Sequence, residues 1–134
     1  MSTPTYLPAL GRLLIALIFV MSGVAKIAAP ANTIAYIQSV GAPFARVAFA
    51  VAVVVEVGGG LALIAGFQTR LTATALAIFT LATAILFHNN MADQNEMVHF
   101  MKNIAITGGL LQVIAFGAGA FSLDNRRKSV SITA

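Results

Sequence analysis

The carboxylate with the clearest chemical meaning is Glu56, which stands near the middle of an otherwise uncharged run from Val47 to Phe67. A run of this length crosses a bilayer as a helix, since roughly 20 residues span roughly 30 Å of hydrocarbon. An ionised carboxylate at that depth costs at least about 2.5–3.5 kcal/mol. A chain avoids this cost unless the carboxylate is paired or used, so Glu56 is the first candidate for a functional side chain.

Glu56 has candidate partners at two depths. With every helix centred in the bilayer and a rise of about 1.5 Å per residue, Arg12 lies roughly 7 Å from Glu56 on one side, whereas the lysines lie roughly 12–14 Å away on the other. We therefore predict a Glu56–Arg12 pair inside the protein, which is either functional or a device that fixes helix register. The outer mouth is expected to gather cationic and imidazole side chains: Lys26, Lys102, His88 and His99.

The two histidines flank the most polar stretch of the chain, which also contains Asp93 and Glu96. Two imidazoles in a helical bundle could hold a haem, but His88 and His99 are more typical of polar groups at a membrane rim, so no metal is expected. The chain has no cysteine, which excludes disulfides and thiolate or iron–sulfur sites. It shows no phosphate-binding loop and no catalytic triad, so an enzymatic activity of its own stays open.

The composition is that of a membrane protein. Of 134 residues, 59% are hydrophobic and 9% are charged, and the mean hydropathy is +0.91, whereas soluble domains are about 25% charged. The net charge of +4 does not indicate nucleic-acid binding. Three of the cations form one cluster just after an apolar segment, where they are typical of a signal for membrane topology.

Four apolar segments are predicted to span the membrane, at about residues 7–27, 44–67, 71–87 and 100–123. The expected fold is an all-α integral membrane four-helix bundle that forms a single domain over residues 1–134. The tight turn from Gly66 to Arg70 makes the second and third segments antiparallel neighbours. Between Ala28 and Pro43, a short helix beginning near Pro30 and a plain loop are equally compatible with the sequence.

Lysine and arginine favour the side that holds both termini, by five to three. That side would carry Arg12, Arg70, Arg126, Arg127 and Lys128, and the other Lys26, Arg46 and Lys102. By the positive-inside rule, we predict that both termini are cytoplasmic.

Each segment carries its polar and small residues on one face, which we expect to turn inward. In the fourth segment this face comprises Lys102, Ala105, Gly109 and Gln112. The glycine clusters 58–60 and 108–109 either admit a flat ligand ring or let helices approach closely, and we favour packing.

Several of these motifs together resemble the DoxX family of small four-helix membrane proteins, over nearly the full chain. The resemblance is carried by Gly11-Arg12, Ser22-Gly23-Val24-Ala25-Lys26, Glu56-Val57-Gly58-Gly59-Gly60-Leu61, Gly66-Phe67-Gln68-Thr69-Arg70, Phe87-His88 and the stretch that begins Phe100-Met101-Lys102-Asn103 and ends at Gly109. It implies a multi-pass protein of the bacterial inner membrane. Relatives in that family act in thiosulfate oxidation coupled to quinone reduction, and others are linked to redox and oxidative-stress complexes. The extra soluble part of the thiosulfate enzyme is absent from this chain, so that activity is not transferred.

Three functions are compatible with these observations. The first is a redox-associated membrane subunit that binds a quinone or similar lipid-soluble molecule in its polar interior. Its site residues would be Glu56 and Arg12 for proton exchange, and Lys26, Lys102, Asn103 and His88 around the ligand. The second is a non-catalytic assembly protein whose buried charges are structural, and the third is a small transporter or proton channel. Membrane lipid, redox- or stress-related proteins and further copies of the chain are the expected partners, and nucleic acid is not.

Overall fold

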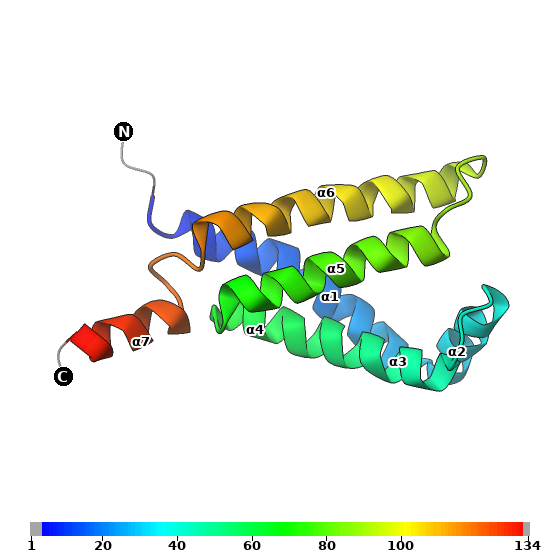
Figure 1. Ribbon diagram of the computed structural model, residues 1–134, viewed down its shortest axis with the longest axis horizontal. Helices are drawn as coiled ribbons and strands as arrows, with labels where there is room; N and C mark the ends of the chain where they lie inside the picture. The colour runs from blue at the N-terminus through cyan, green and yellow to red at the C-terminus, as the bar shows by residue number, and fades with distance from the viewer. Residues whose placement is uncertain (1–3, 133–134) are drawn as a thin grey trace.

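The computed structural model describes residues 4–132, with side chains up to Arg127. Every regular element in this part of the chain is helical. The order is α1 (Leu7–Ala28), α2 (Pro30–Ser39), α3 (Ala45–Val53), the π-helical η1 (Val54–Gly58), α4 (Gly59–Ala65), α5 (Thr69–Phe87), α6 (Gln94–Phe116) and α7 (Leu123–Ile132) (Figure 1). Four stretches are long and apolar enough to cross a membrane: α1, the continuous α3–η1–α4, α5 and α6. The predicted all-α fold with four spanning helices is confirmed.

The boundaries differ from the prediction mainly in the fourth span. It begins at Gln94 rather than Phe100, because the Asp93 carboxylate accepts hydrogen bonds from the backbone of Asn95 and Glu96 and caps the helix. It ends at Phe116, since Gly117 has a φ of +81°. Of the two alternatives for the first connection, the structure has the helix, α2, with Pro30 at its start.

The helices form two closely packed groups that lie against each other (Figure 1). In one group α5 and α6 run antiparallel, and in the other α1 packs along η1 and α4. The start of α1 and α7 lie at one end of the bundle, which we call the terminal end, while α2 and the α5–α6 connection lie at the opposite end (Figure 1). That the terminal end is cytoplasmic stays a prediction, and Lys128 of the basic cluster lies outside the described side chains.

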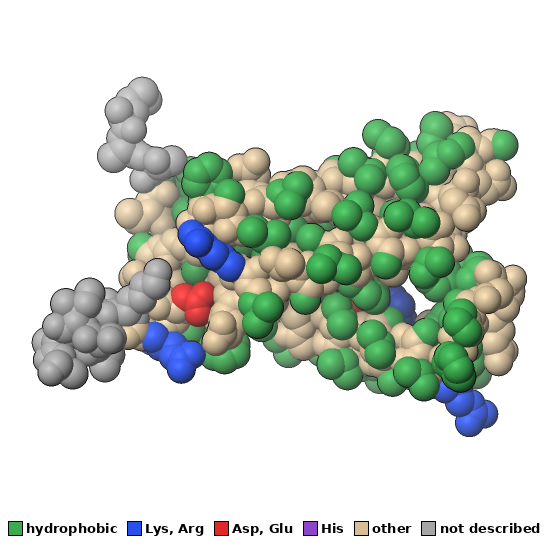
Figure 2. All heavy atoms as spheres, in the orientation of Figure 1, with side chains coloured by type: hydrophobic (Ala, Val, Ile, Leu, Met, Phe, Trp, Pro, Cys, Tyr) green, Lys and Arg blue, Asp and Glu red, His purple; other side chains and the backbone are tan. Residues whose placement is uncertain are grey.

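The outer surface is apolar, as a helical protein in lipid requires. Figure 2 shows hydrophobic side chains along the middle of one face, with the basic side chains mostly toward the ends. Leu14, Val54 and Ile78 are all more than 60% exposed. Because lipid tails are as apolar as these side chains, the helices are held by close packing and polar contacts rather than by hydrophobic burial.

The orientation of α6 corrects one expectation. Ala105 and Gln112 are exposed, so this part of the predicted inward stripe faces outward, and Lys102 is exposed nearer the α5–α6 connection. The buried face lies one position along and contains Asn103 and Thr107. Asn103 turns the helix this way, because its amide nitrogen lies 3.4 Å from both the Thr80 carbonyl oxygen and the Thr83 hydroxyl.

Several of the clustered glycines serve helix packing. A Cβ on Gly60 would lie 2.7 Å from Cγ2 of Val20 and 3.3 Å from the Val20 backbone nitrogen, and one on Gly59 would lie 2.9 Å from Leu76. A Cβ on Gly58 would meet nothing within 4 Å. Gly60 therefore sets how closely α4 approaches α1.

Gly60→Ala should lower the thermal unfolding midpoint in detergent micelles, because the added methyl group overpacks the α1–α4 contact by about 1–3 kcal/mol. Gly58→Ala is the matched control in the same glycine cluster. It should leave the midpoint unchanged or raise it, because alanine favours a helix by about 0.8–1 kcal/mol over glycine. Equal effects of the two substitutions would contradict the assignment of Gly60 to packing.

Arg12 lies at the terminal end, and the predicted Glu56–Arg12 pair is wrong. Its side chain is 1% exposed, and it donates hydrogen bonds to the carbonyl oxygens of Leu63, at 3.1 Å, and of Phe121. The Leu63 carbonyl oxygen also accepts from the Gly66 N–H at the end of α4, so the guanidinium supplies its second hydrogen bond. Arg12 thus joins α1 to α4 and to the segment before α7.

Asp124 completes this attachment. Its carboxylate accepts hydrogen bonds of 2.8 Å from the backbone nitrogens of Gln68 and Thr69, at the start of α5, and its own backbone nitrogen donates to Gly66. Burial by itself would raise the pKa of Asp124, but the hydrogen bonds from Thr69 and Gln68 and the charge of Arg12 hold it below its ordinary value. The α4–α5 turn and the start of α7 are therefore one unit.

Arg12→Met should destabilise the protein by about 1–3 kcal/mol, because the Phe121 carbonyl oxygen loses its donor, whereas that of Leu63 keeps the Gly66 N–H. The measurement is thermal unfolding in detergent. Arg46→Met is the control, since Arg46 is an exposed arginine toward the opposite end, and it should shift the midpoint little. An Arg12 variant as stable as the Arg46 variant would contradict the structural role of Arg12.

Candidate functional site

Glu56 lies on η1, the π-helical turn between α3 and α4. A π-helical turn bonds each residue to the fifth one along and widens the helix locally, and such turns are frequent at functional sites. η1 packs against α1, and Glu56 is 5% exposed. The interrupted helix therefore directs a carboxylate into the protein interior.

The partner of Glu56 is Lys26, with Ser22 completing the group. Lys26 Nζ donates to Glu56 Oε1 at 3.0 Å and to Ser22 Oγ at 2.8 Å, and Ser22 Oγ donates to the same Oε1 at 3.1 Å. Glu56 Oε2 lies 2.9 Å from Lys26 Nζ, yet it is buried and accepts no hydrogen bond from any described residue. A mid-membrane carboxylate is thus neutralised by a lysine from α1.

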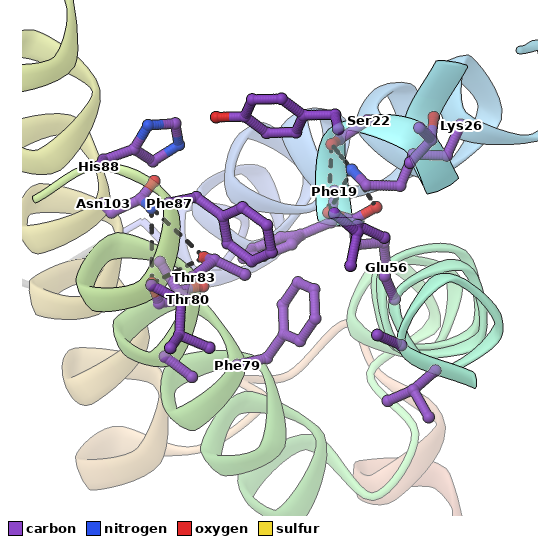
Figure 3. Close-up of a pocket in the computed structure, with 18 of the residues that line it drawn as sticks. Phe19, Ser22, Lys26, Glu56, Phe79, Thr80, Thr83, Phe87, His88 and Asn103 are labelled. Atoms are coloured by element: carbon purple, nitrogen blue, oxygen red, sulfur yellow. Dashed lines mark hydrogen bonds and ion pairs between the residues drawn. The ribbon is translucent and has the colours of Figure 1, made fainter. Parts of the chain in front are cut away.

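A cavity of about 360 Å³ opens beside this ion pair, between α1, α2, α3, α5 and α6. Figure 3 shows Ser22, Lys26 and Glu56 on one side and His88 and Asn103 on the other, with aromatic rings between them. The remaining lining is largely apolar and aromatic, including Phe19, Phe79, Phe87 and Ile106. Ligand sites of about 300–1,000 Å³ with a few polar groups in an apolar wall are common in proteins.

The wall of the cavity opposite Glu56, which we call the far wall, contains His88 and Asn103 and is stabilised by contacts between neighbouring side chains. His88 Nδ1 lies 2.7 Å from Glu96 Oε2, and the His88 ring stacks on that of His99 with centroids 5.0 Å apart. Lys102 Nζ lies 3.0 Å from His99 Nδ1. The gathering of these groups at one end agrees with the expectation for the outer mouth, except that Lys26 lies inside with Glu56.

The stacked imidazoles leave no room for a haem between them. Within residues 4–132, no three His, Cys, Asp or Glu side chains are grouped so as to hold a metal ion.

The cavity reaches the lipid-facing surface between α3 and α5. Val51 and Leu86 line it and are 51% and 57% exposed. The gap exists because α5 packs against α4 and η1, whereas α3 packs against α1, α2 and η1. A molecule dissolved in the hydrocarbon could therefore enter sideways.

At the α2 end, Tyr36 stacks on Phe87 with centroids 5.7 Å apart and forms part of the lining. Partial burial, and then the charge of Glu96, raise the pKa of Tyr36 above its ordinary value. Its hydroxyl is therefore a protonated phenol at neutral pH.

Five of the six predicted site residues line this one cavity: Lys26, Glu56, His88, Lys102 and Asn103. Arg12 is the exception. The depth estimate failed for Lys26 because a lysine side chain extends several ångströms along its helix and need not stay at the level of its Cα. Sequence reasoning missed the roles of Ser22, Tyr36 and Phe87, although the spacing of Ser22 and Lys26, four residues apart on one helix face, could have shown that the two side chains meet.

Comparison with known proteins agrees with this architecture. The DoxX family model matches residues 7–89. The chain is 42% identical over 113 residues to the inner membrane protein YqjF of Escherichia coli K12, covering 84% of this chain and 85% of the relative. It is 35% identical over 122 residues to the inner membrane protein YphA of the same organism, covering 87% of each. No solved structure matches. The chain is an inner-membrane protein that belongs to the DoxX family.

Proposed function

We propose that this DoxX-family protein binds a quinone, or a similar lipid-soluble small molecule, in the cavity beside Glu56, as a redox-associated membrane subunit. The observation that carries the proposal is the cavity itself, which has ionisable groups on two facing walls, aromatic rings between them and a lateral opening toward lipid. A water-soluble substrate would not reach the cavity through the hydrocarbon of the bilayer.

The lining suits a quinone-type ring in three respects. Phe79 and Phe87 offer flat surfaces against which a ring stacks. Lys26 and Lys102 offer ammonium donors to ring oxygens, and Glu56 is a carboxylate that can exchange a proton with a reduced ring. An apolar tail would leave past Val51 and Leu86 into the bilayer.

Electron transfer would need a partner, because the chain has no cysteine for an iron–sulfur cluster. A redox protein that docks on the membrane subunit would deliver the electrons. Such partners, and the expected homo-oligomer, stay predictions.

One observation favours the alternative, a non-catalytic assembly protein. Lys26 and Glu56 already neutralise each other, and a buried ion pair can serve only to specify how helices pack. The two functions predict different binding when both charges are removed together.

Glu56→Gln should lower the affinity for the reduced form of a short-tailed benzoquinone by about 10–100-fold, since a hydrogen bond to a charged group contributes about 1.5–3 kcal/mol. Binding is measured by equilibrium dialysis of the protein in lipid nanodiscs, and copurifying compounds by mass spectrometry. Asp93→Asn is the matched carboxylate-to-amide control, because Asp93 is exposed, lies outside the cavity lining and caps α6, a role that asparagine also fills, so this variant should retain binding.

The double variant Lys26→Met with Glu56→Gln distinguishes the two functions. It leaves no unpaired charge, so it should fold like the wild type, yet the proposed function requires that it bind poorly. A double variant that regains both stability and full binding would show that the ion pair only fixes packing.

A further inference from the structure

One oxygen of the cavity-lining Glu56 carboxylate has no hydrogen-bond donor aligned on it. Ser22 and Lys26 both direct their hydrogen bonds to Glu56 Oε1. Oε2 is buried and accepts no hydrogen bond from any residue the structure describes, although Lys26 Nζ is 2.9 Å away. The ammonium neutralises the charge but aligns no N–H on this oxygen, so a ligand that donates to it adds a hydrogen bond to a charged acceptor.

The far wall also turns an acceptor toward the cavity. The amide nitrogen of Asn103 faces the Thr80 carbonyl oxygen, and a carbonyl oxygen only accepts, so the assignment of nitrogen and oxygen is determined by chemistry. The same nitrogen faces the Thr83 hydroxyl. The Asn103 oxygen Oδ1 is therefore the atom of the amide that remains available to accept a hydrogen bond from a ligand (Figure 3).

From these two acceptors we infer that the cavity selects a ligand with hydroxyl donors on an aromatic ring, and that it binds a hydroquinone in preference to the corresponding quinone. This inference rests on the proposed function and names the redox state that the site holds. A hydroquinone donates one O–H to Glu56 and the other to Asn103. A quinone carries only acceptor oxygens, so against Glu56 it would meet a like partial charge. Lys26 would have to give up contacts with Ser22 or Glu56 to donate to it, and Lys102 its contact with His99.

Access to Oε2 needs only a small movement. The terminal torsion of a glutamate side chain has a broad energy minimum, and rotation about it exchanges which oxygen faces the cavity. Lys26 can follow, because its side chain is 25% exposed. The preference therefore depends on the carboxylate and not on one frozen rotamer.

The experiment compares three short-tailed probes with the same ring: the hydroquinone, the benzoquinone and the hydroquinone dimethyl ether, which has the oxygens but no O–H. Equilibrium dialysis is done anaerobically with protein in nanodiscs, and empty nanodiscs correct for partition into lipid. The wild type should bind the hydroquinone at least about tenfold more tightly than either other probe. This comparison needs no variant, so it holds even where a substitution prevents folding.

Glu56→Gln offers an N–H donor in place of a charged acceptor, so it should reduce or reverse the preference, while Asp93→Asn should retain it. Equal or tighter binding of the quinone by the wild type, or an unchanged preference in folded Glu56→Gln protein, would overturn the inference and leave the proposed function standing. Failure of the wild type to bind any of the three probes would instead remove the proposed function and the inference with it.

Discussion

The ion pair between Lys26 and Glu56 is the interaction on which the interior depends. Neither charge is tolerated alone in hydrocarbon, so α1 and η1 must come together wherever the protein is folded. Gly23 makes that approach possible, because a Cβ there would lie 3.2 Å from Glu56 Cβ and still closer to the Val57 side chain. The ion pair therefore requires the close contact between α1 and η1, and the absence of a side chain at Gly23 permits it.

The two ends of the bundle are built differently for a related reason. At the terminal end, Arg12 and Asp124 bind backbone groups of three segments, and α4, α5 and the start of α7 are held together. At the opposite end, α3 and α5 separate and the polar groups bind side chains around a cavity. The contacts at the terminal end thus hold the backbone of the bundle, whereas those at the opposite end position side chains around the cavity. This arrangement suits ligand binding better than uniform packing.

Sequence reasoning succeeded where the solvent decides the structure. Helix spans follow from hydropathy and length, and the gathering of five site residues in one cavity follows from the rule that polar groups in a membrane protein face its interior. It failed where two partners competed. Arg12 had both Glu56 and the carbonyl groups at the end of α4 within reach, and sequence spacing does not show which geometry is better. The outward position of Ala105 and Gln112 had the same origin, because the Asn103 side chain, through its contacts with α5, occupies the buried face.

The sequence by itself therefore determined the membrane environment, the four spans and the set of polar side chains that need partners, because these depend on composition and helical periodicity alone. Only the tertiary structure decided that Glu56 pairs with Lys26, that a π-helical turn presents it and that a cavity lies beside it. Those features depend on the relative rotation and depth of helices to within a few ångströms. Close contacts at glycines and individual hydrogen bonds set these quantities, and a sequence pattern with a period of 3.6 residues does not resolve them.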